Sequence, residues 1–145
     1  MKFEGRVEIK APRQAVYAFL TDPTKVGSCG PGVESIEVVD ETHFTARAKV
    51  GVGFISAKFV VHGEFAELEA PSRAVIKARG QAPGSAVDAT ATMTLTEQGD
   101  VTVMDWQADV MIAGTIASVG ARLIEGTANK MSAQTFDCIQ AKLEA

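Results

Sequence analysis

The most constraining feature of this sequence is a long alternation of apolar and polar residues that runs from Val33 to Met111. A period of two residues is typical of strands that bury one face. Turn signals interrupt the alternation, and they include Asp40-Glu41, Ala70-Pro71-Ser72, Ala82-Pro83-Gly84 and Gln98-Gly99-Asp100. Because a parallel crossover needs a dozen or more residues, strands joined by such short turns must form an antiparallel meander.

The six strands of this meander are expected at residues 34–39, 44–50, 55–62, 73–81, 87–95 and 102–110. A further strand is expected at residues 3–10, where the same alternation ends at Ala11-Pro12. Residues 13–21 predict a short helix with Val16, Phe19 and Leu20 on one face. The segment 24–32 is either a loop or a broken second helical turn.

The period changes to that of a helix over residues 115–143. One face of this helix carries Ile116, Val119, Gly120, Leu123, Ile124, Thr127 and Met131. Thr115 follows Gly114 and is the expected N-cap. A helix of this length needs packing to be stable, and the sheet is the only apolar surface available to it. The sequence therefore predicts one α+β domain over residues 1–145, with a curved antiparallel sheet of about seven strands around a long C-terminal helix.

Composition and charge exclude several classes of protein. The net charge of −4 is spread along the chain, whereas a nucleic-acid-binding protein needs a concentrated basic patch. The uncharged stretch 110–121 is too short and too polar to cross a bilayer, and Lys2 and Glu4 stand where a signal peptide needs apolar residues. Cys29 and Cys138 lie far apart and form no CxxC motif, so we expect reduced thiols in an intracellular protein.

An apolar cavity is expected between sheet and helix. Many inward positions of the strands are small, namely Ala46, Ala48, Ala57, Ala89, Ala91 and Ala108, and Gly120 and Thr127 interrupt the apolar stripe of the helix. A protein interior is close-packed, so small residues need large partners or leave a void. We expect the lining to comprise Phe44, Phe59, Met93, Met104, Trp106, Ile116, Gly120, Leu123, Ile124, Thr127 and Met131. The alternative is that these residues simply pack as core.

Other candidate sites have weaker patterns. His43 and His62 match no metal-ligand spacing and are expected in solvent, so no metal site is predicted. Asp88, Asp105 and Asp109 have the outward phase of their strands and are expected on a solvated face, which could equally serve a protein partner. Cys29 is either a reactive loop thiol or an incidental one. Residues 27–32 form either a flexible lip at the cavity mouth or a plain loop.

The order of elements resembles the START/Bet v 1-like (SRPBCC) superfamily, which has the helix-grip fold. Four stretches are similar to the CoxG family, the G subunit of carbon monoxide dehydrogenase: FEGRVEI at 3–9, AP…VY…LTD at 11–22, PGVE at 31–34 and AG.IA..G.RLI at 113–124. The resemblance implies an accessory role beside a molybdenum hydroxylase of the carbon monoxide dehydrogenase type. It also implies a cavity for a hydrophobic molecule such as a quinone. Many members have a membrane-tethering C-terminal extension; here Ala145 directly follows the expected helix, a departure that leaves open whether this protein has such a tether.

Three functions remain open from the sequence. The leading hypothesis is a non-catalytic accessory protein that binds a hydrophobic small molecule, a lipid or a quinone-like compound, without an intrinsic cofactor or any nucleic-acid partner. Its expected partner is the molybdenum hydroxylase, which it would help to mature or to recruit to the membrane. Its expected place is the cytoplasm, peripheral at the inner face of the membrane. The second hypothesis is an enzyme similar to polyketide cyclases or dehydratases. The third is a scaffold that recruits a partner enzyme and has an incidental cavity.

Overall fold

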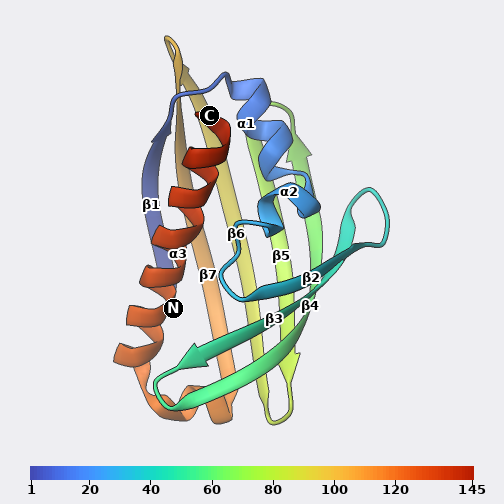
Figure 1. Ribbon diagram of the computed structural model, residues 1–145, viewed down its shortest axis with the longest axis vertical. Helices are drawn as coiled ribbons and strands as arrows, with labels where there is room; N and C mark the ends of the chain where they lie inside the picture. The colour runs from blue at the N-terminus through green and yellow to red at the C-terminus, as the bar shows by residue number, and fades with distance from the viewer.

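The computed structural model describes residues 1–145 and contains one antiparallel sheet of seven strands (Figure 1). The strands are β1 (Lys2–Ile9), β2 (Val33–Val38), β3 (His43–Val52), β4 (Ile55–Glu69), β5 (Arg73–Ala82), β6 (Ser85–Gln98) and β7 (Val101–Gly114). Their spatial order is β1-β7-β6-β5-β4-β3-β2. The predicted meander is therefore confirmed, since β2 to β7 pair consecutively. β1 pairs with β7 and so forms the edge of the sheet opposite β2, with Lys2 across from Asp109 and Ile9 across from Thr102.

Several strands extend beyond the predicted bounds, and β4 shows why. The expected strand ended at His62, but β4 continues to Glu69. Gly63 and Phe65 keep the inward phase of Phe59, and a register shift between Phe65 and Glu67 then lets the strand bend. The rings of Phe65 and Phe44 lie 5.8 Å apart, which fixes the pairing of β4 with β3 at this point.

Two short helices connect β1 to β2. These are α1 (Arg13–Leu20), which buries Val16, Phe19 and Leu20 as predicted, and α2 (Pro23–Gly27). The segment left open between a loop and a helical turn is thus partly helical. Asp22 caps α2, because its side chain accepts hydrogen bonds from the backbone N–H groups of Thr24 and Lys25, and proline suits the first helical position.

The C-terminal helix begins later than predicted. Residues Thr115–Val119 form a short 3₁₀ helix, η1, and the α-helix α3 spans Ala121–Leu143. Gly120 separates them with a φ of +99°, a conformation that glycine adopts without steric cost. The interpretation of Gly120 as a mid-helix residue is therefore wrong, as is that of Thr115 as the N-cap, a position held by Gly114 in η1 and by Gly120 in α3. None of the helices is both long and apolar enough to cross a membrane.

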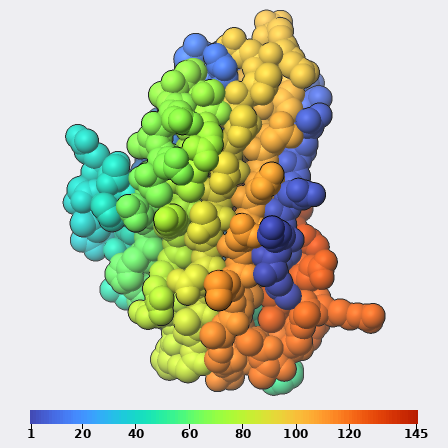
Figure 2. All heavy atoms as spheres, turned by 180° about the vertical axis from the view of Figure 1, so that it is seen from behind, coloured from blue at the N-terminus to red at the C-terminus, as the bar shows by residue number.

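The helices lie on the inner face of the sheet (Figure 1), while the strands remain uncovered when the molecule is seen from behind (Figure 2). The interior is divided into two clusters. The larger one joins α1 and the C-terminal part of α3 to the sheet and contains Ile9, Ala11, Val16, Phe19, Leu20, Cys29, Leu95, Met104 and Ile139. The smaller one contains Val52, Phe59, Ile116 and Ile124. The space between helix and sheet is thus packed more fully in one half of the molecule.

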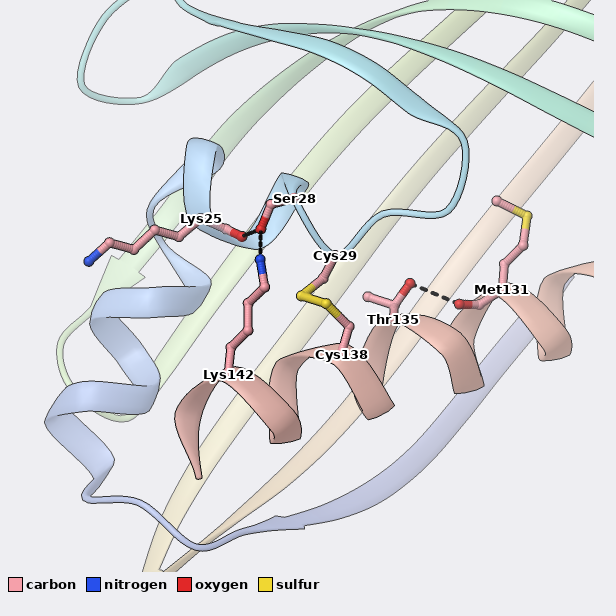
Figure 3. Close-up of a disulfide and its surroundings, with 7 residues drawn as sticks. All are labelled: Lys25, Ser28, Cys29, Met131, Thr135, Cys138 and Lys142. Atoms are coloured by element: carbon pink, nitrogen blue, oxygen red, sulfur yellow. Dashed lines mark hydrogen bonds between the residues drawn. A yellow bond between two sulfur atoms is a disulfide. The ribbon is translucent and has the colours of Figure 1, made fainter. Parts of the chain in front are cut away.

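A disulfide bond links Cys29, in the loop after α2, to Cys138 of α3 (Figure 3). The two Cα atoms lie 5.4 Å apart, although 109 positions separate the residues in sequence. Next to this bond, the Lys142 ammonium donates a hydrogen bond of 2.6 Å to the Ser28 hydroxyl. The expectation of two free thiols, and with it a reactive Cys29, is therefore wrong: the fold brings together two cysteines that no local motif connects.

Candidate functional site

An apolar cavity of about 240 Å³ lies between the sheet and the N-terminal half of α3. Five strands and the helical segments η1 and α3 contribute to it, and 14 of its 16 lining residues are hydrophobic. The lining consists of Ala48, Val50, Val52, Phe59, Val61, Ala78, Gly80, Val87, Ala89, Val110, Ile112, Ile116, Ile124, Thr127, Ala128 and Met131. Larger hollows on the surface, such as the one beside β1 and the end of α3, are lined mainly by polar and charged residues. We therefore regard the apolar cavity as the candidate site.

Small residues on facing elements explain why this space is not filled. Ala78 and Gly80 of β5 and Ala89 of β6 point inward at the level of the cavity, and Ala128 of α3 faces them from the helix. Close packing would require a large side chain opposite each small one. Here small residues occur on both sides, so the sheet and helix enclose a void.

Thr127 carries the only polar side chain among the lining residues, but the surface of the cavity itself is entirely apolar. The Thr127 hydroxyl makes no hydrogen bond with another residue of the chain, unlike that of Thr135, which donates to the Met131 carbonyl at 2.8 Å. Burying an ionised or strongly polar group without partners is costly. The cavity can therefore accept an apolar molecule, or the apolar part of a larger one.

A second hollow of about 260 Å³ adjoins the cavity and shares Val50, Thr127 and Met131 with it. We call this hollow the vestibule; it is lined by Pro31, Gly32, Lys49, Val50, Gly51, Thr127, Lys130, Met131 and Gln134. The loop that was expected to form either a cavity lip or a plain loop thus contributes Pro31 and Gly32 to its edge. Gly32 has a φ of +77°, and a Cβ there would collide with the Lys49 carbonyl, so only glycine fits this close approach.

The sequence matches the family model of CoxG, the G subunit of carbon monoxide dehydrogenase, over residues 5–144. The chain belongs to the CoxG family. No curated protein matches the sequence.

Solved structures show that this CoxG-family chain has the helix-grip fold of the START/Bet v 1-like (SRPBCC) superfamily. A conserved protein from Geobacillus kaustophilus is 22% identical, with a TM-score of 0.92 over 99% of this chain and 95% of that chain. A START superfamily protein from Mycobacterium smegmatis is 11% identical, with a TM-score of 0.74 over 99% and 97%. An aromatase/cyclase from a Streptomyces species is 18% identical, with a TM-score of 0.72 over 99% and 93%. At these identities the likeness concerns the fold alone.

The cavity of the CoxG-family chain is lined by five of the eleven residues that were expected there, namely Phe59, Ile116, Ile124, Thr127 and Met131. Met93, Met104 and Trp106 do face inward, but they belong to the larger core cluster, where the Trp106 ring lies 5.1 Å from that of Phe136. Phe44 packs against Phe65 over Gly63. Leu123 is 47% exposed. Gly120 lies between η1 and α3, with open space where a Cβ would be.

The cavity residues that sequence reasoning missed are mostly aliphatic. Val52, Val61, Val87, Val110 and Ile112 all have the inward phase of their strands. The alternation alone identifies this phase, but it does not tell how far along a strand the helix leaves a gap. The predicted lining favoured aromatic residues and methionine. It therefore also included inward residues at the end of the sheet where the helices fill the space.

The titratable residues singled out from the sequence lie outside the cavity. His43 Nδ1 lies 2.9 Å from a carboxylate oxygen of Asp40, and His62 Nδ1 lies 3.2 Å from the Thr45 hydroxyl. Hydrogen bonds from the Thr42 backbone N–H and from His43 lower the pKa of Asp40 to about 2. No three His, Cys, Asp or Glu side chains are grouped to hold a metal ion.

The three aspartates lie on the outer face of the sheet, as expected. Asp105 pairs with Arg6 at 2.8 Å, and Asp88 pairs with Arg79 at 3.5 Å. Asp109 lines the same outer hollow as Asp88. Exposed pairs of this kind contribute little to stability. They make the outer face polar, which suits a sheet that has water on one side.

Proposed function

We propose that this protein is a non-catalytic accessory protein that holds a hydrophobic small molecule, a lipid or a quinone-like compound, in the apolar cavity. The observation that carries the proposal is a void between sheet and helix whose wall is entirely apolar and consists mainly of aliphatic side chains. Ligand sites are concave and mostly apolar, with a few polar groups for orientation. In this proposal the bound molecule is cargo, and the protein has no intrinsic cofactor.

Filling the cavity tests this function. Ala89→Leu places a larger side chain in the void, whereas Ala86→Leu makes the same change on the outer face of the same strand. We expect the wild type and Ala86→Leu to bind the apolar fluorophore N-phenylnaphthylamine and to retain a co-purified molecule in native mass spectrometry. Ala89→Leu should lose both. Equal binding by all three proteins, or no binding by the wild type after solvent extraction, would rule the cavity out.

The proposed partner is a molybdenum hydroxylase of the carbon monoxide dehydrogenase type. Its support is the family's description as a subunit of carbon monoxide dehydrogenase. The large subunits of such a hydroxylase serve as bait in a pull-down with wild type and Ala89→Leu. A ligand carrier with a filled cavity should still bind the hydroxylase but should no longer support the activity of the hydroxylase. A scaffold would support that activity as wild type and as Ala89→Leu.

We also propose that the protein acts in the cytoplasm, peripheral at the inner face of the membrane, where a lipid or quinone can be exchanged with the bilayer. Cell fractionation tests this placement. Recovery in the cytoplasmic fraction and on inner membranes would support it, and recovery outside the cytoplasm would contradict it.

A cyclase-like enzyme is the second candidate, because a solved aromatase/cyclase shares the fold. Thr127 would have to take part in such a reaction, since it carries the only polar side chain in the cavity. Thr127→Val keeps the shape and removes the hydroxyl. An accessory protein should still function with this variant, whereas an enzyme should lose turnover while it still binds N-phenylnaphthylamine.

A further inference from the structure

One end of the molecule is almost free of charge. It consists of the tip of the β3–β4 hairpin, the β5–β6 turn, η1 and the start of α3, which lie together in Figure 1. The segments that form it, residues 51–57, 82–86 and 112–124, contain a single charged residue, Arg122. Since 22% of the whole chain is charged, this region, which we call the hairpin end, differs from the rest of the surface.

Two large apolar side chains are exposed at the hairpin end. Phe54 is 90% exposed and Leu123 is 47% exposed. Gly53 and Phe54 form the turn of the hairpin, in which Val52 pairs with Ile55. The Leu123 side chain lies 3.2 Å from where a Cβ of Gly53 would be. The two exposed side chains therefore belong to segments that touch each other.

The hairpin behind this tip is cationic. Over residues 45–63 it contains Arg47, Lys49 and Lys58 and no carboxylate, although the net charge of the chain is −4. All three side chains alternate with inward residues and are exposed on the outer face of the sheet. None of them takes part in a salt bridge. Lys49 lies directly opposite Lys58, an arrangement of like charges that is unfavourable within the protein itself.

The spacing of these groups suits the surface of a bilayer. Lys49 precedes Gly53 by four residues and Lys58 follows Phe54 by four, which is about 13 Å along a strand. When the Phe54 ring enters the boundary between head groups and acyl chains, the long lysine side chains reach the lipid phosphates. Protein interfaces are depleted in lysine, so the combination favours an anionic bilayer over a protein partner.

The hairpin end also borders the apolar cavity. Val52 and Ile124 line the cavity, and they are the chain neighbours of Gly53 and Leu123. A bilayer at this end lies next to the cavity wall, which suits a protein that exchanges a hydrophobic molecule with a membrane.

From these observations we propose that the hairpin end docks on a bilayer that contains anionic lipids. Phe54 and Leu123 insert into the interface, and Lys49, Lys58 and Arg122 contact the lipid phosphates. This inference rests on the proposed placement at the membrane and names the docking surface and the charge of the lipid. It does not depend on what the cavity holds.

Vesicle flotation tests the docking surface. The full chain is mixed with vesicles of phosphatidylcholine alone, or of equal parts of phosphatidylcholine and phosphatidylglycerol. The wild type should bind the mixed vesicles more tightly, and added salt should weaken this binding because exposed charges are screened. Phe54→Ser should weaken it about tenfold. Val39→Ser changes a 61% exposed side chain in the β2–β3 turn, at the other end of β3, and should bind as the wild type does.

Matched lysine variants test the charges. Lys49→Gln combined with Lys58→Gln should weaken binding to the mixed vesicles about tenfold. Lys25→Gln combined with Lys77→Gln removes the same charge from exposed positions in α2 and β5, and should keep the binding. Since all four lysines are exposed, both double variants should melt as the wild type does.

A fluorescent probe locates the contact. The emission of Phe54→Trp should shift to shorter wavelength with mixed vesicles and should be quenched by brominated phosphatidylcholine. Val39→Trp should respond as the wild type does, whose only tryptophan is Trp106.

The possible failures are distinguishable. If all variants bind mixed vesicles equally, membrane association stands and the hairpin end is not the docking surface. Equal binding of the wild type to both kinds of vesicle would overturn the role of anionic lipid. If the wild type binds neither, the docking proposal fails, while binding of N-phenylnaphthylamine still decides the cavity function. If vesicles are not bound and Phe54→Ser instead loses the hydroxylase in the pull-down, the hairpin end is a protein interface.

Discussion

Gly63 in β4 illustrates how one residue fixes the packing of its neighbours. The ring of Phe44, its cross-strand partner in β3, lies where a Cβ of residue 63 would be. Gly63→Ala should therefore force the ring to move and lower the free energy of unfolding by about 1–3 kcal/mol, a usual cost of overpacking. Urea denaturation measures the change.

Gly126 provides the opposite case and serves as the control. It lies within α3 and has open space where a Cβ would lie. Gly126→Ala should raise the free energy of unfolding by up to about 1 kcal/mol, because alanine is the better helix former. Equal shifts in both variants would contradict the role assigned to Phe44.

The turn between β2 and β3 predicts a pH effect at Asp40. Its carboxylate accepts hydrogen bonds from the backbone N–H groups of Thr42 at 2.9 Å and of His43 at 2.8 Å. These bonds and the contact with the His43 ring lower the pKa from 3.8 to about 2. A depressed carboxyl pKa contributes stability that is complete above pH 3.8 and is lost as the pH falls toward 2.

An NMR titration of the Asp40 side-chain carboxyl should therefore give a midpoint near 2. His43→Ala removes the ring and should raise this midpoint, while the backbone hydrogen bonds remain. A midpoint that does not change in His43→Ala would show that the backbone N–H groups alone lower the pKa.

At the scale of elements, the disulfide is the strongest link between distant segments. It attaches the loop after α2 to α3, and that loop also supplies Pro31 and Gly32 to the vestibule. Closing a loop of this length restricts the unfolded chain, and the entropy lost corresponds to about 5 kcal/mol of native stability. The double variant Cys29→Ser with Cys138→Ser should therefore melt about 15 °C lower than the oxidised wild type.

Reduction of the wild type provides the control for this element. With a thiol reductant present, the melting temperature of the wild type should fall to that of the double serine variant, which the reductant should not affect. A wild type that is insensitive to reduction, with both thiols shown to be free, would mean that packing of α3 on the sheet already holds the loop.

The elements also show how far sequence reasoning reaches in this fold. Alternation and turn residues predicted every strand, because hairpin connections and one buried face determine a meander locally. The break at Gly120 was missed, since the apolar period continues across it and only the backbone conformation distinguishes a hinge from a helical residue. The pairing of Cys29 with Cys138 was missed for a related reason: it follows from the docking of α3, a contact that neither local sequence contains.

At the scale of the whole molecule, the two core clusters have different roles. The larger cluster packs α1 and the C-terminal part of α3 onto the sheet, and Met104 within it is completely buried. The smaller cluster, with Phe59 and Ile124, borders the cavity. The inward phase of both sets was predictable, but their assignment to a filled end and a hollow end depends on how the helix crosses the sheet.

This division predicts that stability and binding respond to different substitutions. Met104→Ala removes a fully buried side chain and should lower the free energy of unfolding by about 2–5 kcal/mol, with unchanged affinity for N-phenylnaphthylamine below the melting transition. Val87→Ala enlarges the existing cavity and should cost only about 1–2 kcal/mol. It should shift the preferred chain length of competing straight-chain alcohols upward. Urea denaturation and fluorophore displacement on the same samples measure both quantities. If Met104→Ala changed the chain-length preference as much as Val87→Ala does, the two clusters would act as one interior. A void at one end would then alter the packing at the other end through α3.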